Sequence, residues 1–529
     1  MKPFGMLGSR TIGIDREGSR VGLELAYNKE LSGVEGKQLQ QRLPGNVWKP
    51  ISNEYLVEPV EGMDVVSSID IHLQDVASHA LEDQLIKHGA AWGTVILMEV
   101  ETGFVKAVAN LSLNEESQTY SENFNLAIAQ SIEPGSTFKL ASLMAAMDDG
   151  LIQLEDSIDT GDGIHYFYDK PMKDSNYKSN GSGGHGMLSI EQVFEQSSNI
   201  GTALAIKKAY GLNEQAFLDK LHSMGLGNSL DIRIKGEVKP FIYKEEREGN
   251  WSGLSLTQMA IGYEVKQTPL QTLAFYNAVA NNGVMLRPQY VSSLQSKGKT
   301  IKRNEPIVIH HKICSDRTLG KVRKMLEGVA EEGGTADYVF DDCKFSVAGK
   351  TGTAKIAKTN GGGYHSNRYS ASFVGYFPAE QPKYSCIVVI NDTKTGVYYG
   401  STIAAPVFRQ LADKIYATRF DFPVEARETN TSIAKAKLPP SKDGAWEDLE
   451  QVYAELGIDV QGSTQEDWVQ ISTGEKSVSI KGKTNTSNLV PNVKGMGLQD
   501  ALFILENVGL KVAVEGYGTV KRQSIPAGS

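Results

Sequence analysis

A serine and a lysine three residues apart open a helical pattern that is apolar on nearly all sides. Ser136 and Lys139 follow the turn-forming pair Pro134-Gly135, and the apolar pattern ends near Gly150. Residues three apart share one face of a helix, so the hydroxyl and the amine can approach each other. A serine becomes a nucleophile when a base takes its proton, and a lysine can be that base when burial lowers its pKa. The pattern predicts a serine nucleophile with a lysine base.

The same spacing occurs elsewhere in the chain without an apolar helix. The other Ser-x-x-Lys pairs are Ser175–Lys178, Ser296–Lys299 and Ser432–Lys435. They lie in a glycine-rich loop, a lysine-rich turn and a polar linker, where both side chains are expected to face solvent. Because so short a spacing has little specificity by itself, the local context is what singles out Ser136.

Two further motifs follow in chain order. Ser197-Ser198-Asn199 stands between two predicted helices, and Lys350-Thr351-Gly352-Thr353 lies within a predicted strand. By themselves these motifs are also compatible with a helix cap and a bulged edge strand. Copies of the short patterns occur at Ser112, Ser121 and Lys394. The Lys394 copy follows a finished strand and is predicted to be a hairpin turn. The ordered set of three motifs is one described for penicillin-binding proteins and class A β-lactamases.

Composition and charge exclude several broad classes of function. The 529 residues are 40% hydrophobic and carry a formal net charge of −9, which argues against nucleic acid as the main partner. The cysteines at 314, 343 and 386 are far apart, so we expect neither a zinc site nor a disulfide framework. We expect no metal and no cofactor. No run of 18 apolar residues occurs, so no membrane-spanning segment is predicted within these residues.

The predicted elements indicate an α+β fold. A helix at 72–87 and a hairpin at 92–109 precede the Ser136 helix, and strands near 345–355, 369–378 and 384–392 follow it. This order predicts an antiparallel sheet flanked by helices, with an all-helical subdomain after Ser136. The predicted divisions are a β-rich region at 1–62, a catalytic domain at 63–418, a linker at 419–487 that could enclose a small helix, and a small α/β module at 488–529 that looks truncated.

With these motifs, the chain resembles a class B penicillin-binding protein, a monofunctional peptidoglycan D,D-transpeptidase. The similarity extends from about Arg10 to Tyr416. Residues 1–62 then resemble part of the family's N-terminal pedestal, a dimerisation-like domain, and the end of the chain is similar to a PASTA module. Supporting segments are Gly22-Leu-Glu, Leu31–Gly36, Ser197–Gly201, Thr268–Thr272, Ala280–Gly283, Phe373–Ala379, Tyr398–Gly400 and Ala404–Phe408. One PASTA-like module behind such a domain resembles the septal, cell-division type.

The resemblance implies a role for each motif residue. Ser136 would attack the bond between two terminal D-alanines of a stem peptide, and Lys139 would be the base. Ser197 would pass the proton to the leaving amine, and Asn199 would hold Lys139 and the substrate amide. Lys350 would keep Lys139 neutral and attract the substrate carboxylate. Thr351 and Thr353 would bind that carboxylate, and Gly352 would let the substrate backbone approach. The backbone N–H groups of Ser136 and Thr353 would form the oxyanion hole.

The implied partners are D-Ala-D-Ala stem peptides, an acceptor amine, β-lactam antibiotics and cell-division membrane proteins. The family uses an N-terminal membrane helix, so we expect a trimmed ectodomain that works on the extracytoplasmic (periplasmic) side of the cell membrane. Two alternatives stay open. One is a hydrolase on the same fold, a D,D-carboxypeptidase or β-lactamase, and the other is a catalytically silent wall-binding scaffold.

Overall fold

The structure is a computed structural model that describes residues 5, 7–15, 20–51, 55–243, 245, 251–358, 363–419, 438, 441–474, 477–483 and 489–529. It divides into two units, Met1–Asp421 and Phe422–Ser529. Most of the first part of the predicted linker, residues 420–437, lies outside the described residues.

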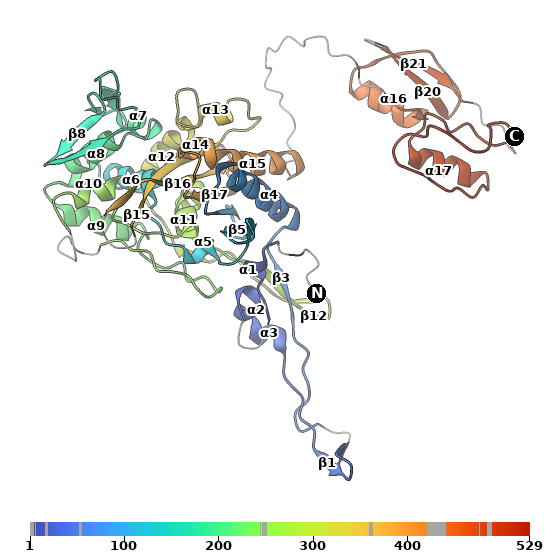
Figure 1. Ribbon diagram of the computed structural model, residues 1–529, viewed down its shortest axis with the longest axis horizontal. Coiled ribbons are helices and arrows are strands. Elements are labelled where there is room, and N and C mark those ends of the chain that lie inside the picture. Colours follow the sequence, from blue (N-terminus) through green and yellow to red (C-terminus); the bar gives the residue numbers. More distant parts are fainter. Residues whose placement is uncertain are drawn as a thin grey trace. The chain divides into compact units, whose positions relative to one another are not determined.

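A six-stranded antiparallel sheet forms the centre of the first unit (Figure 1). The order of its strands is β15-β16-β17-β4-β5-β6. These strands are β4 (Trp92–Glu99), β5 (Val105–Asn114), β6 (Thr119–Ser121), β15 (Ala348–Ala357), β16 (Tyr364–Phe377) and β17 (Tyr384–Asn391). Every residue of β17 is buried, as expected for a strand with both faces covered. The predicted antiparallel sheet is confirmed, and β15 lies at its edge.

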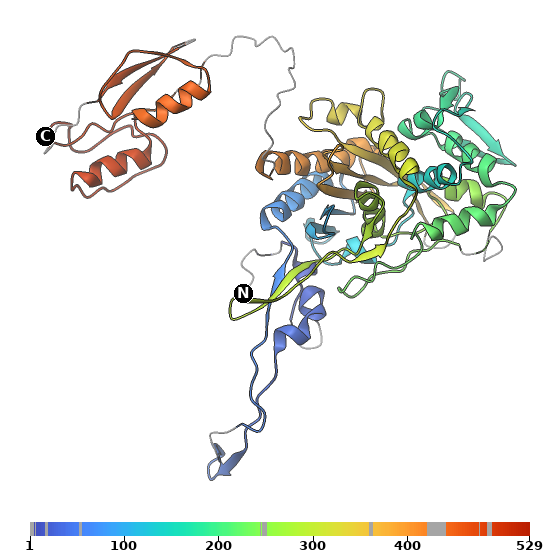
Figure 2. The same cartoon turned by 180° about the vertical axis from the view of Figure 1, so that it is seen from behind.

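Helices cover both faces of this sheet (Figures 1 and 2). Helices α4 (Ile71–His88) and α15 (Ala405–Arg419) pack against each other on one face, and α11 (Pro269–Ala280) packs on the other. Helix α11 is buried along its whole length. Its start is set by Thr268, whose side chain accepts a hydrogen bond from the Gln271 amide in a capping box.

A helical subdomain packs around α6 (Lys139–Asp148), the helix that carries the predicted lysine base. Its helices are α7 (Ile190–Glu195), α8 (Asn199–Tyr210), α9 (Glu214–Ser223) and α10 (Ser255–Ala260), with α12 (Asp316–Gly328) alongside. Residues 139–147 of α6 are all buried. The prediction of a helix that is apolar on nearly all sides is therefore confirmed, and Lys139 lies inside the protein.

The first 62 residues differ from the predicted β-rich pedestal. Short helices α1 (Ser9–Ile12), α2 (Gly22–Ala26) and α3 (Asn28–Ser32) precede a two-stranded hairpin, β1 (Gln40–Leu43) and β2 (Val47–Pro50). The predicted β-rich region is wrong for residues 22–26, which form α2 and bury Leu23 against the catalytic domain. Short apolar runs do not distinguish a strand from a buried helix.

Small elements connect these parts of the first unit. Strands β3 (Asp64–Ser67), β12 (Val291–Ser296) and β13 (Lys299–Arg303) form a three-stranded sheet in the order β13-β12-β3. The remaining elements are α5 (Leu126–Ala129), η1 (Gly135–Phe138), β7 (Ser157–Asp159), β8 (Ile164–Phe167), β9 (Lys170–Lys173), β10 (Met187–Ser189), β11 (Met285–Leu286), β14 (Val308–His310), α13 (Asp337–Phe340) and α14 (Gly400–Ile403).

The second unit holds more structure than the predicted linker and single module. Residues 444–482 form a four-stranded sheet in the order β18-β20-β21-β19, with helix α16 (Trp446–Glu455). The strands are β18 (Gly444–Ala445), β19 (Asp459–Gln461), β20 (Trp468–Thr473) and β21 (Ser477–Gly482). The helix was predicted, but the strands were not, because short runs with few apolar residues in a polar stretch do not establish a periodicity. The last module carries α17 (Leu498–Asn507), and Lys483 links the two by pairing with Asp443 at 2.8 Å and donating to the Lys494 carbonyl oxygen.

Candidate active site

Ser136 lies on a single 3₁₀ turn, η1, that continues directly into α6. The sequence predicts an ordinary first helical turn at this position, and the turn is tighter than that. Gly135 begins it with φ of +55°, and a Cβ built on Gly135 would lie 2.9 Å from the Cβ of Ala354 on β15. The turn can therefore press against the edge strand of the sheet only because residue 135 has no side chain.

The side chain of Lys139 is fully buried and points to the Ser197 turn. Its amine donates hydrogen bonds to the Ser197 carbonyl oxygen at 2.6 Å and to Asn199 Oδ1 at 2.7 Å, and Ser197 Oγ is 3.4 Å away. Burial lowers the pKa of Lys139 to about 7, although the nearby Asp174 carboxylate acts in the opposite direction. Within the described residues, Ser136 Oγ has no hydrogen-bond partner.

The residues of the Ser197-Ser198-Asn199 motif have different structural roles. Ser197 has φ of +54°, a left-handed conformation that is uncommon for serine. Ser198 is the helix cap: its Oγ accepts a hydrogen bond from the Gly201 amide at the start of α8. A cap alone would explain Ser198 but not Ser197, whose strained backbone aims its carbonyl oxygen at Lys139. Such strain is retained where the surrounding contacts hold it in place.

Asp174, which sequence reasoning missed, holds this turn. The carboxylate is buried and accepts hydrogen bonds from Ser198 Oγ at 2.7 Å, from the Asn199 amide at 2.6 Å and from the Ile200 amide at 3.0 Å. The adjacent Lys173 carbonyl oxygen accepts a hydrogen bond from the Asn199 side chain. Asp174 is 25 residues from Asn199, so no local sequence pattern connects them.

Lys350 lies on edge strand β15 and is also fully buried. Burial lowers its pKa well below the usual value, and the positive charge of Lys139 acts in the same direction. Its amine donates to the Thr351 carbonyl oxygen at 3.1 Å and lies 5.5 Å from the centre of the Phe194 ring. The site thus contains two buried amines, Lys139 on α6 and Lys350 on β15. Their positive charges would repel each other if both amines were protonated.

The space beside Gly352 leaves no room for a side chain. A Cβ built on it would collide with Ser372 Oγ and lie 2.9 Å from the methyl group of Thr137 on the nucleophile turn. The glycine therefore makes room for the turn that carries Ser136. Approach of the substrate backbone to Gly352 stays a prediction, and packing against Thr137 is a further reason for a glycine here.

The backbone of β15 has an open side. The Lys355 amide donates to the hydroxyl of Tyr263 at 3.2 Å and not to the neighbouring strand. Because N–H groups two residues apart on a strand point the same way, the Thr353 amide points to the same open side. The Thr353 carbonyl oxygen lies there too, since it is 3.2 Å from a Cβ built on Gly135.

The two threonine hydroxyls of the motif already have partners. Thr351 Oγ1 lies 3.0 Å from Thr335 Oγ1, and Thr353 Oγ1 donates to the Tyr398 carbonyl oxygen at 3.4 Å. Thr335 belongs to a segment that also reaches the serine motif, because the side chain of Gln196 donates to the Gly333 carbonyl oxygen. Sequence reasoning missed Thr335, which lies in a glycine-rich loop without a recognisable pattern.

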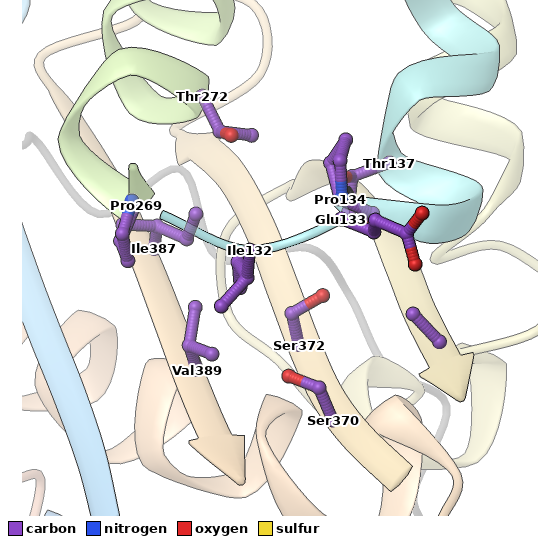
Figure 3. A pocket seen from close by; sticks show the side chains of 11 residues that line it. Ile132, Glu133, Pro134, Thr137, Pro269, Thr272, Ser370, Ser372, Ile387 and Val389 are labelled. Carbon is purple, nitrogen blue, oxygen red and sulfur yellow. Dashed lines mark hydrogen bonds between the residues drawn. The ribbon is translucent and has the colours of Figure 1, made fainter. Parts of the chain in front are cut away.

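A cavity of about 10 Å³ lies behind the nucleophile turn, which is room for about one water molecule. Figure 3 shows the segment carrying Ile132, Glu133 and Pro134 crossing strands whose side chains include Ser370 and Ser372. The turn is thus supported from behind by the sheet. Burial raises the pKa of Glu133, which accepts a hydrogen bond from the hydroxyl of Tyr364 at 2.9 Å.

The remaining copies of the motifs lie elsewhere. Lys394 follows β17, and its amide donates to the His88 carbonyl oxygen at the end of α4. Ser296–Lys299 forms the turn between β12 and β13, and Ser432 lies outside the described residues. In the part of the chain that the structure describes, no group of three or more His, Cys, Asp or Glu side chains could hold a metal ion. Across the same residues, no helix is both long and apolar enough to cross a membrane.

Comparison with known proteins agrees with this arrangement. A family model for the penicillin-binding protein transpeptidase domain matches residues 93–413, and one for the PASTA domain matches residues 488–529. The peptidoglycan D,D-transpeptidase FtsI of Buchnera aphidicola is 31% identical over 418 residues, which cover 77% of this chain and 68% of that protein. Stage V sporulation protein D of Bacillus subtilis is 25% identical over 484 residues, 87% of this chain and 71% of that protein.

A solved structure shows the same fold. Penicillin-binding protein 3 of Mycobacterium tuberculosis, in complex with aztreonam, superposes with a TM-score of 0.66 at 24% identity, covering 79% of this chain and 89% of that one. The transpeptidase match spans more than half of the chain, and its edges enclose all three motifs. This protein belongs to the penicillin-binding protein transpeptidase family, as a class B member with a serine D,D-transpeptidase domain and a PASTA domain.

Proposed function

We propose that Ser136 is acylated by the D-Ala-D-Ala end of a stem peptide and that an amine of a neighbouring stem then takes the acyl group. The observation that carries this proposal is the state of Lys139. A neutral lysine amine has two N–H donors and one lone pair, and two carbonyl-type oxygens at 2.6 and 2.7 Å accept both donors. The lone pair is then left to take a proton, and a pKa of about 7 keeps much of the amine neutral at neutral pH.

The other motif residues support this chemistry from both sides. Ser197 Oγ, 3.4 Å from the Lys139 amine, can return the proton to the leaving group. The Thr353 amide, on the open side of β15, and the Ser136 amide would stabilise the oxyanion, where one donor is worth about 3 kcal/mol. Thr351, Thr353 and Lys350 would receive the substrate carboxylate, and the open edge would accept the substrate as an added strand beside Gly352.

Intact-mass spectrometry with benzylpenicillin tests the proposal. We expect one stable adduct on Ser136 that is absent from Ser136→Ala and unchanged in Ser175→Ala, a serine of the rejected Ser175–Lys178 pair. Labelling that persists in Ser136→Ala would refute the assignment. An adduct that forms and disappears with release of product would identify a hydrolase, and no adduct in the parent protein would favour a silent scaffold.

We also propose that cross-linking takes place during septal wall synthesis, outside the cytoplasmic membrane and together with cell-division membrane proteins. The support is the class B domain joined to a C-terminal PASTA domain. A fluorescent fusion should concentrate at division sites and depletion should produce unseparated filaments. Uniform labelling of the cell side wall, with rounded cells on depletion, would instead indicate an elongation role.

A further inference from the structure

The pedestal carries a long hairpin arm, whose described residues are 34–51 and 55–60, and the arm extends away from the rest of the first unit (Figures 1 and 2). Its two sides pair with each other, through Val34 and Val60 at the base and through β1 and β2 at the far end. A two-stranded hairpin by itself is at best marginally stable in water. A partner surface that covers the end of the arm would therefore stabilise it.

The tip of the arm, residues 39–51, exposes large apolar side chains on both of its faces. Leu43 lies opposite Val47, and Arg42 lies opposite Trp48. Because neighbouring residues of a strand point to opposite faces, Leu43 and Val47 are on one face and Trp48 is on the other. The large apolar residues of the tip, each 37–63% exposed, are Leu39, Leu43, Val47, Trp48 and Ile51. A partner must reach both faces to cover them.

The same segment is basic, although the chain as a whole is acidic. Residues 36–53 contain Lys37, Arg42 and Lys49 and neither Asp nor Glu, whereas the whole chain carries a formal net charge of −9. None of the three cations has an ion-pair partner among the described residues. Arg42 lies 5.9 Å from the centre of the Trp48 ring. Unpaired cations beside exposed apolar side chains are complementary to a surface that is both anionic and apolar.

We infer that the tip binds the surface of a membrane that contains anionic lipids. Tryptophan is enriched at membrane–water interfaces, where its ring lies at the level of the headgroups. Each basic residue near an anionic surface strengthens binding by about fivefold. Apolar and electrostatic attraction together give stable association where either alone is marginal. A lipid surface also surrounds the tip and covers both faces, whereas a flat protein surface would leave one face exposed.

The backbone of the hairpin limits how deeply the tip enters the membrane. Among the described residues, β1 and β2 pair only with each other, so their outer edges keep free N–H and C=O groups. Such groups are not tolerated in the hydrocarbon core, and the tip therefore lies among the headgroups. The arm connects α3 to β3, so binding would hold the first unit at the membrane surface. It does not involve the acylation chemistry of Ser136.

Vesicle flotation with the whole 529-residue chain tests the inference. The probes are phosphatidylcholine vesicles with and without phosphatidylglycerol, an anionic lipid. We expect binding to the anionic vesicles that weakens at high salt and is much weaker without phosphatidylglycerol. The double variant Arg42→Gln/Lys49→Gln should weaken binding by about 30-fold, since each charge contributes about fivefold. Leu43→Ser/Val47→Ser should weaken it by about tenfold or more, because apolar area is lost from the contact.

Tryptophan fluorescence locates the contact with a variant that keeps the hairpin intact. Trp48→Phe retains an aromatic ring, so it should bind the anionic vesicles nearly as well as the parent. Lipids with brominated acyl chains should quench the fluorescence of the parent when it binds. This quenching should disappear in Trp48→Phe, because the other tryptophans lie outside the arm.

Matched controls change the same kinds of residue outside the arm. Leu212→Ser removes an exposed leucine between α8 and α9, and Arg317→Gln/Lys344→Gln removes two exposed cations of the catalytic domain. Both controls should bind the anionic vesicles as the parent does. All variants should keep benzylpenicillin labelling of Ser136, so failure of this inference is distinguishable from failure of the proposed function.

Several outcomes would overturn the inference. They are a parent chain that does not bind anionic vesicles, arm variants that bind as tightly as the parent, and quenching that persists in Trp48→Phe. Equal binding to phosphatidylcholine alone would overturn the requirement for anionic lipid. Sedimentation velocity without lipid tests for a second copy on the tip: a dimer that Leu43→Ser/Val47→Ser dissociates would also overturn the inference.

Discussion

The amine of Lys139 lies 2.6 Å from the carbonyl oxygen of Ser197, a serine whose own backbone is left-handed with φ of +54°. The short contact and the unusual backbone belong together. Turning Ser197 into an ordinary conformation would move its carbonyl oxygen away from the lysine and leave a buried N–H unpaired, which costs about 1–3 kcal/mol. The strain at Ser197 is thus coupled to the orientation of the base, and Asp174 holds both through the start of α8.

Replacing Asp174 with Asn should slow acylation of Ser136 by about 10- to 100-fold, because the Ser197 turn loses a buried charged acceptor. It should also shift the pH dependence. Lys139 must be neutral to act as a base, so acylation rises as pH increases through its pKa of about 7. The Asp174 carboxylate raises that pKa. Asp174→Asn should therefore move the pH range over which the acylation rate increases to lower pH.

The measurement is the second-order rate constant for acylation by a chromogenic β-lactam between about pH 5 and 9, a range that brackets the Lys139 pKa. Asp159→Asn, an exposed aspartate on β7, is the matched control and should leave the profile unchanged. If acylation slows equally at every pH and the pH at which the rate rises stays the same, Asp174 acts only on the structure of the site and not on the pKa of Lys139.

Lys350→Met should raise the free energy of unfolding at pH 7 by about 1–2 kcal/mol, since a buried charge is replaced by an apolar side chain of similar length. Burial lowers the folded pKa of Lys350 below its usual 10.5, so the unfolded chain binds the extra proton. The folded state is penalised below the folded pKa, and the penalty disappears as pH rises toward 10.5. The advantage of Lys350→Met should shrink over that same range.

Chemical denaturation of Lys350→Met and the parent at several pH values checks this, with acylation measured alongside. Acylation should fall by at least about 100-fold, as expected when a group that stabilises the transition state is lost. Lys344→Met, at a residue outside β15, is the control for charge removal. If the gain in stability is the same at every pH, the gain does not come from the ionisation of Lys350.

Gly352→Ala should disturb the nucleophile turn, because the added methyl would collide with Ser372 Oγ and lie 2.9 Å from the Thr137 methyl. We expect acylation to fall by about tenfold or more, as small displacements of a reacting group do. Thr137→Ser removes that methyl and keeps the hydroxyl, which donates to the Pro134 carbonyl oxygen. Adding Thr137→Ser to Gly352→Ala should restore part of the rate.

Acylation rates of the two single variants and the double variant form the double-mutant cycle for this contact. Gly363→Ala, at a glycine with nothing near its Cβ position, gives a control substitution in the same domain, although its φ of +83° adds local strain. Strictly additive losses for Gly352→Ala and Thr137→Ser would contradict the proposed contact.

Removing the second unit by ending the chain after Asp421 should leave the acylation rate within about threefold, because the catalytic domain has its own core. The cut must follow α15, which runs to Arg419, where the side chain pairs with Asp70 at the start of α4. Ending the chain after Tyr416 would remove that pair. A large loss of acylation rate in the longer truncation, with an unchanged melting temperature, would show that the second unit takes part in catalysis.

The sequence by itself determined the main elements of the catalytic domain. Strong periodicity predicted α4, the β4–β5 hairpin, α6, β17 and the closing helix, and the capping pair Ser189 and Gln192 located the start of α7. The three motifs were recognisable because each has its own local context, above all the apolar helix that follows Ser136. Local patterns of this kind depend only on neighbouring residues, so they can be read without knowing the fold.

Tertiary structure decided which distant residues meet. Asp174 reaches the Asn199 amide across 25 positions of sequence, Thr335 reaches Thr351, and Gly352 meets Thr137, all without a local signal. The helical start of the pedestal and the sheet at 444–482 were missed because short runs of few apolar residues allow either periodicity. Burial also set the low pKa of Lys139 and of Lys350, since desolvation comes from the packed surroundings and not from a residue's neighbours in the chain.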